Sequence, residues 1–186
     1  MPKIRNLQFL CLGACPVSDA CIPHLNQCSS LTQLFLGSTQ VSVQGFKALT
    51  VKLERIGCNL AGNMHLSEIA PILSLTQKKL QAISLEYDVS DSDVEAIKKL
   101  NQIKVLEVTG GLSESTFAKI AELSQIETIT VSGSLAVLTN ANLMKLAGMK
   151  RLKKLDIRYA SHRDGLNSEG IAAFKKERPN VEFLTE

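Results

Sequence analysis

Residues 80–97 read LQAISLEYDVSDSDVEAI, and the first six of them indicate the fold class. They follow an L-x-x-L-x-L pattern in which Leu80, Ile83 and Leu85 are the apolar positions. Such alternation predicts a short strand whose apolar side chains share one face. The pattern recurs roughly every 25 residues, which is the spacing of a repeat protein. The other units begin with Leu7/Leu10/Leu12, Leu31/Leu34/Leu36, Leu53/Ile56/Cys58, Ile103/Leu106/Val108, Ile126/Ile129/Val131 and Leu152/Leu155/Ile157, with a remnant at Val181/Leu184.

The second half of the same stretch predicts a short amphipathic helix. Ser90 can accept a hydrogen bond from a free backbone N–H, as a helix N-cap must. Apolar residues return four and seven positions later, at Val94 and Ile97, so one face of the helix is apolar. In the third unit this stripe slips by one residue, to Ile72 and Leu75. The equivalent caps in the other units are Ser18, Ser42, Ser67, Ser113, Thr139 and Asn167.

Each unit is therefore a strand, a loop, a helix and a turn, and the chain holds about seven units. No single unit can bury its apolar face alone, but stacked units bury one continuous core. This arrangement resembles the leucine-rich repeat family over essentially the full length of the chain. The resemblance implies an α/β solenoid, a curved arc with a parallel β-sheet on its concave face and short helices on its convex face.

The first unit, residues 7–31 (LQFLCLGACPVSDACIPHLNQCSSL), is similar to the cysteine-containing, ribonuclease-inhibitor-like subclass of that family. The subclass has Cys at the ninth position of the motif and just before the next strand, which here are Cys15 and Cys28. In the family the ninth side chain bonds the backbone of neighbouring repeats in a ladder. We expect much of that ladder to be missing, because later units place other residues there: Thr39, Ala61, Asp88, Gly111, Ser134 and Ala160.

Residues 1–186 are predicted to form a single leucine-rich-repeat domain. Pro179 ends the last helix, and Val181 and Leu184 belong to a final short strand. That strand has an open edge, so we expect a monomer or a weak dimer through the C-terminal edge. The start is less complete than the end, as expected if the chain is the C-terminal part of a longer protein.

Composition is that of an ordinary globular domain, with 45% hydrophobic and 21% charged residues. No apolar run is long enough to span a bilayer, and no signal-peptide pattern is present. The five cysteines are odd in number and crowd the first third, which favours reduced thiols and a cytoplasmic location. Cys15, Cys21, His24 and Cys28 lack the C-x2–4-C spacing of zinc sites. We therefore expect no metal and no cofactor.

Catalytic motifs are nearly absent, which argues against an enzyme. The tripeptide His162-Arg163-Asp164 resembles the catalytic loop of protein kinases, but Glu169 stands where that motif has Asn. The sequence contains no P-loop, no G-x-S-x-G elbow and no H-E-x-x-H motif. An enzyme that uses the loop 158–165 is the alternative from another function class.

Basic residues gather at predicted helix ends and acidic residues at helix starts. Lys98/Lys99 and Asp91/Asp93 in one unit are examples, and both pairs complement the helix dipole. A basic rim could also bind nucleic acid or acidic lipid. However, the net charge is only +3 and the chain has no Trp, so stacking platforms for bases are scarce. We favour the dipole-and-solubility interpretation, with steering of an acidic partner as a further role for the rim.

Residues between the inward-facing apolar positions should line the concave sheet and form the partner-binding surface. Exposed aromatic side chains are typical anchors, so Phe9 and Phe35 are candidates, unless a preceding unit covers them. Arg158 beside Tyr159 is a typical hot-spot pairing, although Arg158 and its charged neighbours could instead pair with Glu107. The predicted surface is Phe9, Phe35, Arg55, Glu86, Glu107, Lys154, Asp156, Arg158 and Tyr159.

Three strand-to-helix loops, residues 59–65, 132–137 and 158–165, are longer than the rest, and insertions often mark the binding rim of a repeat protein. We therefore predict a protein–protein interaction module that binds through the concave sheet and these loops. One alternative, implied by the resemblance of the first repeat, is the substrate-recognition half of a ubiquitin-ligase adaptor. A bacterial effector that imitates such a receptor in the host cytosol fits the same features.

Overall fold

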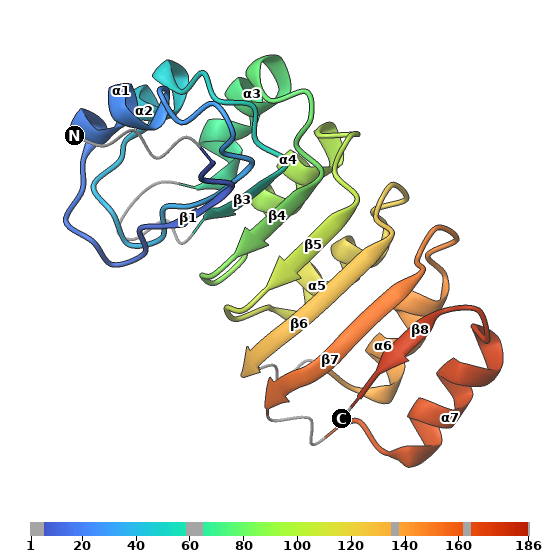
Figure 1. Ribbon diagram of the computed structural model, residues 1–186. Coiled ribbons are helices and arrows are strands. Elements are labelled where there is room, and N and C mark those ends of the chain that lie inside the picture. Colours follow the sequence, from blue (N-terminus) through green and yellow to red (C-terminus); the bar gives the residue numbers. More distant parts are fainter. Residues whose placement is uncertain (1–5, 59–64, 135–137, 162–164, 186) are drawn as a thin grey trace.

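In the part of the chain that the structure describes, eight parallel strands form one open sheet, and each strand pairs with the next along the chain (Figure 1). The computed structural model describes residues 6–58, 65–134, 138–161 and 165–185. The strands in this part of the chain are β1 (Phe9–Cys11), β2 (Gln33–Phe35), β3 (Arg55–Cys58), β4 (Ala82–Leu85), β5 (Val105–Val108), β6 (Thr128–Ser134), β7 (Lys154–Ser161) and β8 (Glu182–Leu184).

A helix lies between each strand and the next, and the helices cover one face of the sheet while the other stays open (Figure 1). The predicted α/β leucine-rich-repeat solenoid is therefore confirmed. The helical elements are η1 (Asp19–Cys21), α1 (Ile22–Leu25), α2 (Val43–Ala48), α3 (Leu66–Thr76), α4 (Asp91–Lys99), α5 (Glu114–Ala121), α6 (Asn140–Ala147) and α7 (Ser168–Glu177). None of the helices in the described residues is long and apolar enough to cross a membrane.

The core follows the predicted repeat register. The central leucine position of each unit pairs with the same position of the next, so Ile83 pairs with Leu106 and Leu106 with Ile129. All three side chains are at most 2% exposed. Stacked apolar side chains thus form one continuous core between the sheet and the helices, which no single repeat could bury alone.

Most of the predicted helix caps are confirmed. In α2, α4, α5, α6 and α7 the predicted side chain accepts a backbone N–H in the first turn, at 3.1 Å for Ser42 and 3.0 Å for Asn167. Ser18 was also predicted as a cap, but its side chain makes no such bond. The chain there forms η1 and the four-residue α1, which is too short to present a regular set of free N–H groups.

The third unit differs from its prediction. Helix α3 begins directly after His65, whose backbone N–H donates to the Glu68 carboxylate at 2.7 Å, so Ser67 lies inside the first turn and is not the cap. The buried face of α3 contains Leu73, at 1% exposure, and of the predicted stripe only Ile72 packs against the core, where it is partly buried. Leu75 is 74% exposed.

The last strand is also shifted by one residue from its predicted register. Phe183 takes the core position opposite Leu155, and Leu184 lies opposite Asp156. The ring of Phe183 packs edge-on against that of Phe174, with centroids 4.8 Å apart. This aromatic contact favours Phe183 over Leu184 at the core position.

Two of the three predicted long loops are partly strand. β6 and β7 continue their pairing through Gly133 and Ala160, past a register irregularity near Ser132. Gly133 has φ of +88°, and a Cβ there would lie 2.6 Å from the carbonyl oxygen of Thr109, so only glycine fits. Residues 59–64, 135–137 and 162–164, which include the kinase-like tripeptide, lie outside the described residues.

Candidate interaction surface

Two rows of side chains project from the open face of the sheet. The register of the paired strands aligns the residues of each row. The first row begins at β1 with Phe9 and includes Gln33, Arg55, Ala82, Val105, Thr128, Lys154 and Glu182. The second row contains Cys11, Phe35, Gly57, Ser84, Glu107, Thr130, Asp156 and Leu184. Most of the predicted partner-binding residues belong to these rows, which places them on one continuous face.

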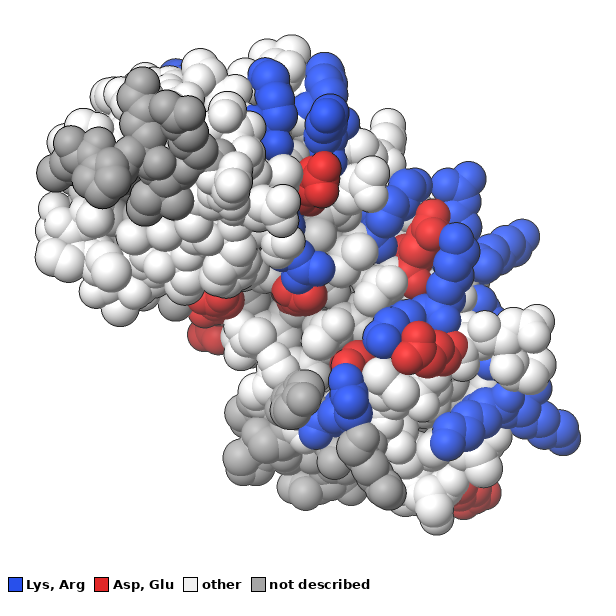
Figure 2. Space-filling model, in the orientation of Figure 1, with Lys and Arg blue, Asp and Glu red and all other residues white. Residues whose placement is uncertain are grey.

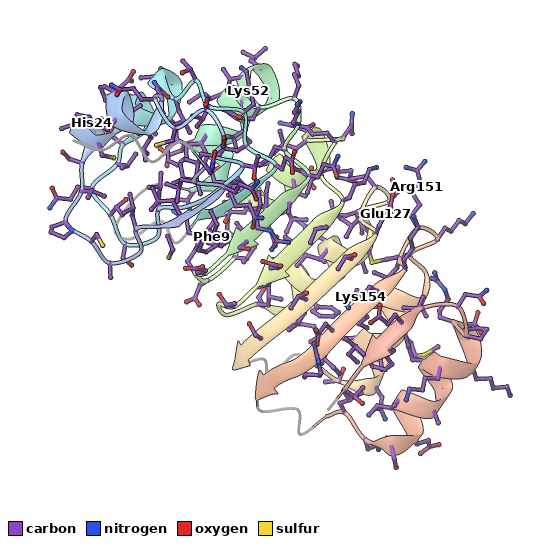
Figure 3. All side chains as sticks on the ribbon, viewed as in Figure 1. Phe9, His24, Lys52, Glu127, Arg151 and Lys154 are labelled. Atoms are coloured by element: carbon purple, nitrogen blue, oxygen red, sulfur yellow. The ribbon has the colours of Figure 1, made fainter. Side chains whose placement is uncertain are left out.

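The end of this face formed by β1 to β3 is aromatic. Phe9 is 52% exposed and its ring contacts that of Phe35, with centroids 5.4 Å apart and planes at 45° (Figure 3). The Phe35 ring lies over Gly57 of the next strand, where any Cβ would collide with it. One face of the Phe35 ring therefore packs on the backbone of Gly57, and the Phe9 ring is the more exposed of the two.

The middle of the face carries a charged network that joins three strands. Arg55 on β3 reaches across β4 and forms an ion pair with Glu107 on β5. The second carboxylate oxygen of Glu107 accepts the hydroxyl of Ser84, whose residue is 3% exposed. Both charged side chains are only about a quarter exposed, at 28% and 25%, so the network is more sheltered from solvent than a surface pair.

Glu86 follows β4 directly and adds a second carboxylate beside this network. Partial desolvation and, to a smaller extent, the negative charge of Glu107 raise the pKa of the Glu86 carboxyl above its ordinary value. No ion pair within the described residues involves Glu86. Glu86 and Glu107 are therefore close enough to repel each other, and only Glu107 is paired with Arg55, so a further cation beside Glu86 would be favourable.

The β6–β8 end of the face is charged and internally paired. Arg158 donates to both carboxylate oxygens of Asp156, at 3.0 and 2.8 Å, and these bonds hold the pKa of Asp156 below its ordinary value. Lys154 pairs with Glu182 at 2.9 Å (Figure 3). These residues were expected to pair with Glu107 and its neighbours; they pair within the chain, but with Asp156 and Glu182, and Glu107 is bound by Arg55 and Ser84.

Tyr159 lies within β7, where it pairs with Ser132, but its side chain is outside the described part of the structure. Gly57 is the position that sequence reasoning missed. A glycine inside a strand often marks a close approach by a neighbouring group, and that signal was available at Gly57.

The cysteines and histidines do not form a metal centre in the described residues, where no group of three potential ligands converges. Cys11, Cys15, Cys21 and Cys28 are free thiols. Burial raises the pKa of the Cys21 thiol above its ordinary value, which disfavours the reactive thiolate form.

Comparison with known proteins identifies no family for the chain. No protein-family model matches it, and no curated protein matches it in sequence. Among solved structures, it is similar to an internalin from Listeria monocytogenes, with 21% sequence identity and a TM-score of 0.47. That match covers 88% of this chain and 43% of the internalin chain, so this chain spans less than half of that protein. The assignment of the fold therefore rests on the strand order and register of the chain itself.

Proposed function

We propose that the chain is a protein–protein interaction module that binds its partner on the open face of the sheet. The binding surface contains Phe9, Phe35, Arg55, Glu86 and Glu107, and we call it the aromatic–acidic surface. The observation that carries the proposal is the exposed Phe9 ring, which contacts the Phe35 ring next to the charged network. Leaving such a ring in water is unfavourable, by about 25 cal/mol for each Å² of apolar area. Burial against a partner removes this penalty.

The surface favours a partner segment with an apolar side chain next to a lysine or arginine. The apolar group would contact Phe9 and Phe35, and the cation would lie near Glu86 and Glu107. Glu107 is already neutralised by Arg55, whereas Glu86 lacks an ion pair among the described residues. A cation near Glu86 would favour its ionised form, which partial desolvation disfavours in the free protein.

The residues Lys154, Asp156, Arg158 and Tyr159 form a second candidate contact region toward β8. Because Lys154 and Asp156 already have partners within the chain, we expect them to contribute specificity more than affinity. The chain's function in this proposal is binding and not catalysis. The alternative of an enzyme depends on the loop 158–165, of which residues 162–164 are outside the described residues.

A finer proposal follows from the first repeat. Its Cys15 and Cys28 are similar to those of the cysteine-containing subclass, and this similarity supports a substrate-recognition role in a ubiquitin-ligase adaptor or in an effector that imitates one. The free thiols of both residues are compatible with a cytoplasmic location. Recovery of ubiquitin-ligase components or their clients with the chain would support this role.

The test uses the immobilised chain as bait in cytosolic lysate, with Phe9→Asp as the surface variant and Met144→Asp as its matched control. Met144 is the exposed apolar residue on helix α6, at 38% exposure, so the control adds the same charge to the convex side. Partners of the concave face should bind wild type and Met144→Asp but not Phe9→Asp. Each recovered candidate is then purified and titrated calorimetrically.

For a purified partner we expect Phe9→Asp to weaken binding about thirtyfold, as for a hot-spot residue. Glu86→Lys should weaken binding of a cationic segment as well, because it replaces the unpaired carboxylate by a positive charge that repels the cation of the segment. Equal affinity of wild type, Phe9→Asp and Glu86→Lys for every purified partner would contradict the proposed surface.

A further inference from the structure

Leu75 is the most exposed large apolar side chain of the described residues, and it shares a groove with four lysines. It lies in the last turn of α3, at 74% exposure. Lys47, Lys52, Lys78 and Lys79 line the same open groove of about 500 Å³, together with Leu49, Thr50 and Thr76. We call Leu75 and these four lysines the Leu75 lysine cluster.

The charge of this cluster is not compensated by carboxylates. Among the residues that the structure describes, none of those lining the groove is acidic. The six ion pairs of the described residues involve other cations, for example Lys153 with Glu127 at 2.6 Å. Lys52 and Lys78 donate to backbone carbonyls at the end of α3, at 3.3 and 2.5 Å. These bonds complement the helix dipole but leave the four positive charges in place.

The cluster lies on a different part of the molecule from the aromatic–acidic surface. It occupies the edge where helices end and strands begin, and Lys52 marks this edge in Figure 3. Lys and Arg gather along the same edge of the molecule in Figure 2. Farther along this edge, acidic residues such as Glu127 pair with the lysines, whereas the described lining of the Leu75 groove contains no acidic residue.

We propose that the Leu75 lysine cluster docks the protein on an anionic phospholipid surface. The lysine ammonium groups would contact lipid phosphates and carboxylates, and Leu75 would enter the boundary between headgroups and acyl chains. A fluid membrane matches this cluster better than an acidic protein does. The groove is open, its cations are on long flexible stems, and Leu75 is a single projecting anchor with no enclosing pocket for a rigid partner.

The experiment measures co-sedimentation of the purified chain with vesicles of phosphatidylcholine alone, or of three parts phosphatidylcholine to one part phosphatidylserine. The charge variant is Lys78→Gln with Lys79→Gln. Its control, Lys175→Gln with Lys176→Gln, removes the same charge from exposed residues at the end of α7. Leu75→Ser tests the apolar anchor, and soluble polyglutamate serves as an acidic-protein probe.

We expect wild type to bind the anionic vesicles at low salt and not the neutral ones. A lysine close to an anionic leaflet contributes about a fivefold gain in partitioning, so the charge variant should lose about 25-fold. The control should lose less than about twofold, because its charges lie far from the anchor. Leu75→Ser should weaken binding about fivefold while leaving its salt dependence unchanged, since it removes apolar contact alone.

Two results would overturn the proposal. One is a control pair that loses as much binding as Lys78→Gln with Lys79→Gln, because any basic part of the rim would then suffice. The other is binding of wild type to polyglutamate with no binding to anionic vesicles, which would assign the cluster to an acidic protein. Unchanged melting of each variant excludes loss of folding as the cause.

Discussion

Gly57 determines where the aromatic part of the open face can form. Its missing side chain lets the Phe35 ring lie across β3, and the Phe9 ring of β1 contacts Phe35 at a tilted angle. A Cβ at position 57 would collide with the Phe35 ring, so the ring would have to move. A residue without a side chain thus sets the shape of the candidate site.

Glu86 gives a pH-dependent test of the site. A pKa raised above the ordinary value of 4.5 means that folding disfavours the ionised carboxylate. This unfavourable contribution is absent when the group is protonated in both states, and it grows as the pH rises above the unfolded pKa. Glu86→Gln should therefore raise the melting temperature near neutral pH and have less effect near pH 4.

The gain should be at most about 0.5 kcal/mol, because solvent screens an exposed carboxylate. Thermal melts at the two pH values, with the exposed Glu122→Gln as control, measure it. A stabilisation of Glu86→Gln that is as large in acid as at neutral pH would show that charge is not its cause.

The helix starts are linked from repeat to repeat by side chains. Asp19 accepts the backbone N–H of Ser42 at 2.7 Å, and Asn140 accepts that of Asn167 at 3.1 Å. Gly45 and Gly170, in the first turns of α2 and α7, leave the space that these acceptors occupy. The ladder that we expected to be weakened at the ninth position is thus partly replaced by bonds at the helix N-termini, where free N–H groups need partners.

The shifted register of β8 can be tested at two adjacent residues. Phe183 packs on Phe174 in the core position, and Leu184 lies beside Asp156 on the open face. Phe183→Ala should reduce the free energy of unfolding by about 2 kcal/mol, less than for a fully buried ring because Phe183 is half-buried. Leu184→Ala should reduce it by less than about 1 kcal/mol. Denaturant unfolding measures both, and the reverse order would restore the register predicted from the sequence.

For the whole molecule, the sequence predicts the stacking of the repeats well, because the buried apolar positions set the period of the repeat. Leu106 and its equivalents occupy the expected register, and five of the predicted caps bond as expected. The prediction fails in α3, where the helix begins after His65 instead of at the predicted Ser67, and where Leu75 lies on the exposed face.

The candidate site was only partly predictable. The alternation of apolar and polar residues in the strands predicts that Arg55 and Glu107 lie on the open face. It does not predict that they contact each other. Their ion pair joins side chains that are 52 residues apart and crosses an intervening strand. The length of the arginine side chain and the small Ser84 between the two make this contact possible. No local pattern in the sequence encodes such a combination.

The integrity of the stack depends on the buried row that runs through all repeats. Leu106 is 0% exposed and lies between Ile83 and Ile129 of the adjacent strands. An aspartate at this position would place an unpaired charge between two repeats, far from water. Because each repeat is stabilised mainly by its neighbours, a defect in the middle separates the two halves of the solenoid.

Leu106→Asp should therefore lower the free energy of unfolding by about 4 kcal/mol or more, a large share of the roughly 5–15 kcal/mol typical of a domain. The matched control is Val105→Asp, which adds the same charge one residue earlier, where the side chain is half-buried on the open face. Circular dichroism melts of both variants measure the difference. We expect Val105→Asp to melt within a few degrees of wild type and Leu106→Asp to be unfolded or aggregated. If Leu106→Asp instead melted cooperatively close to wild type, the side chain of residue 106 could not lie between stacked repeats, and the alternation that defines both faces of the sheet would be wrong.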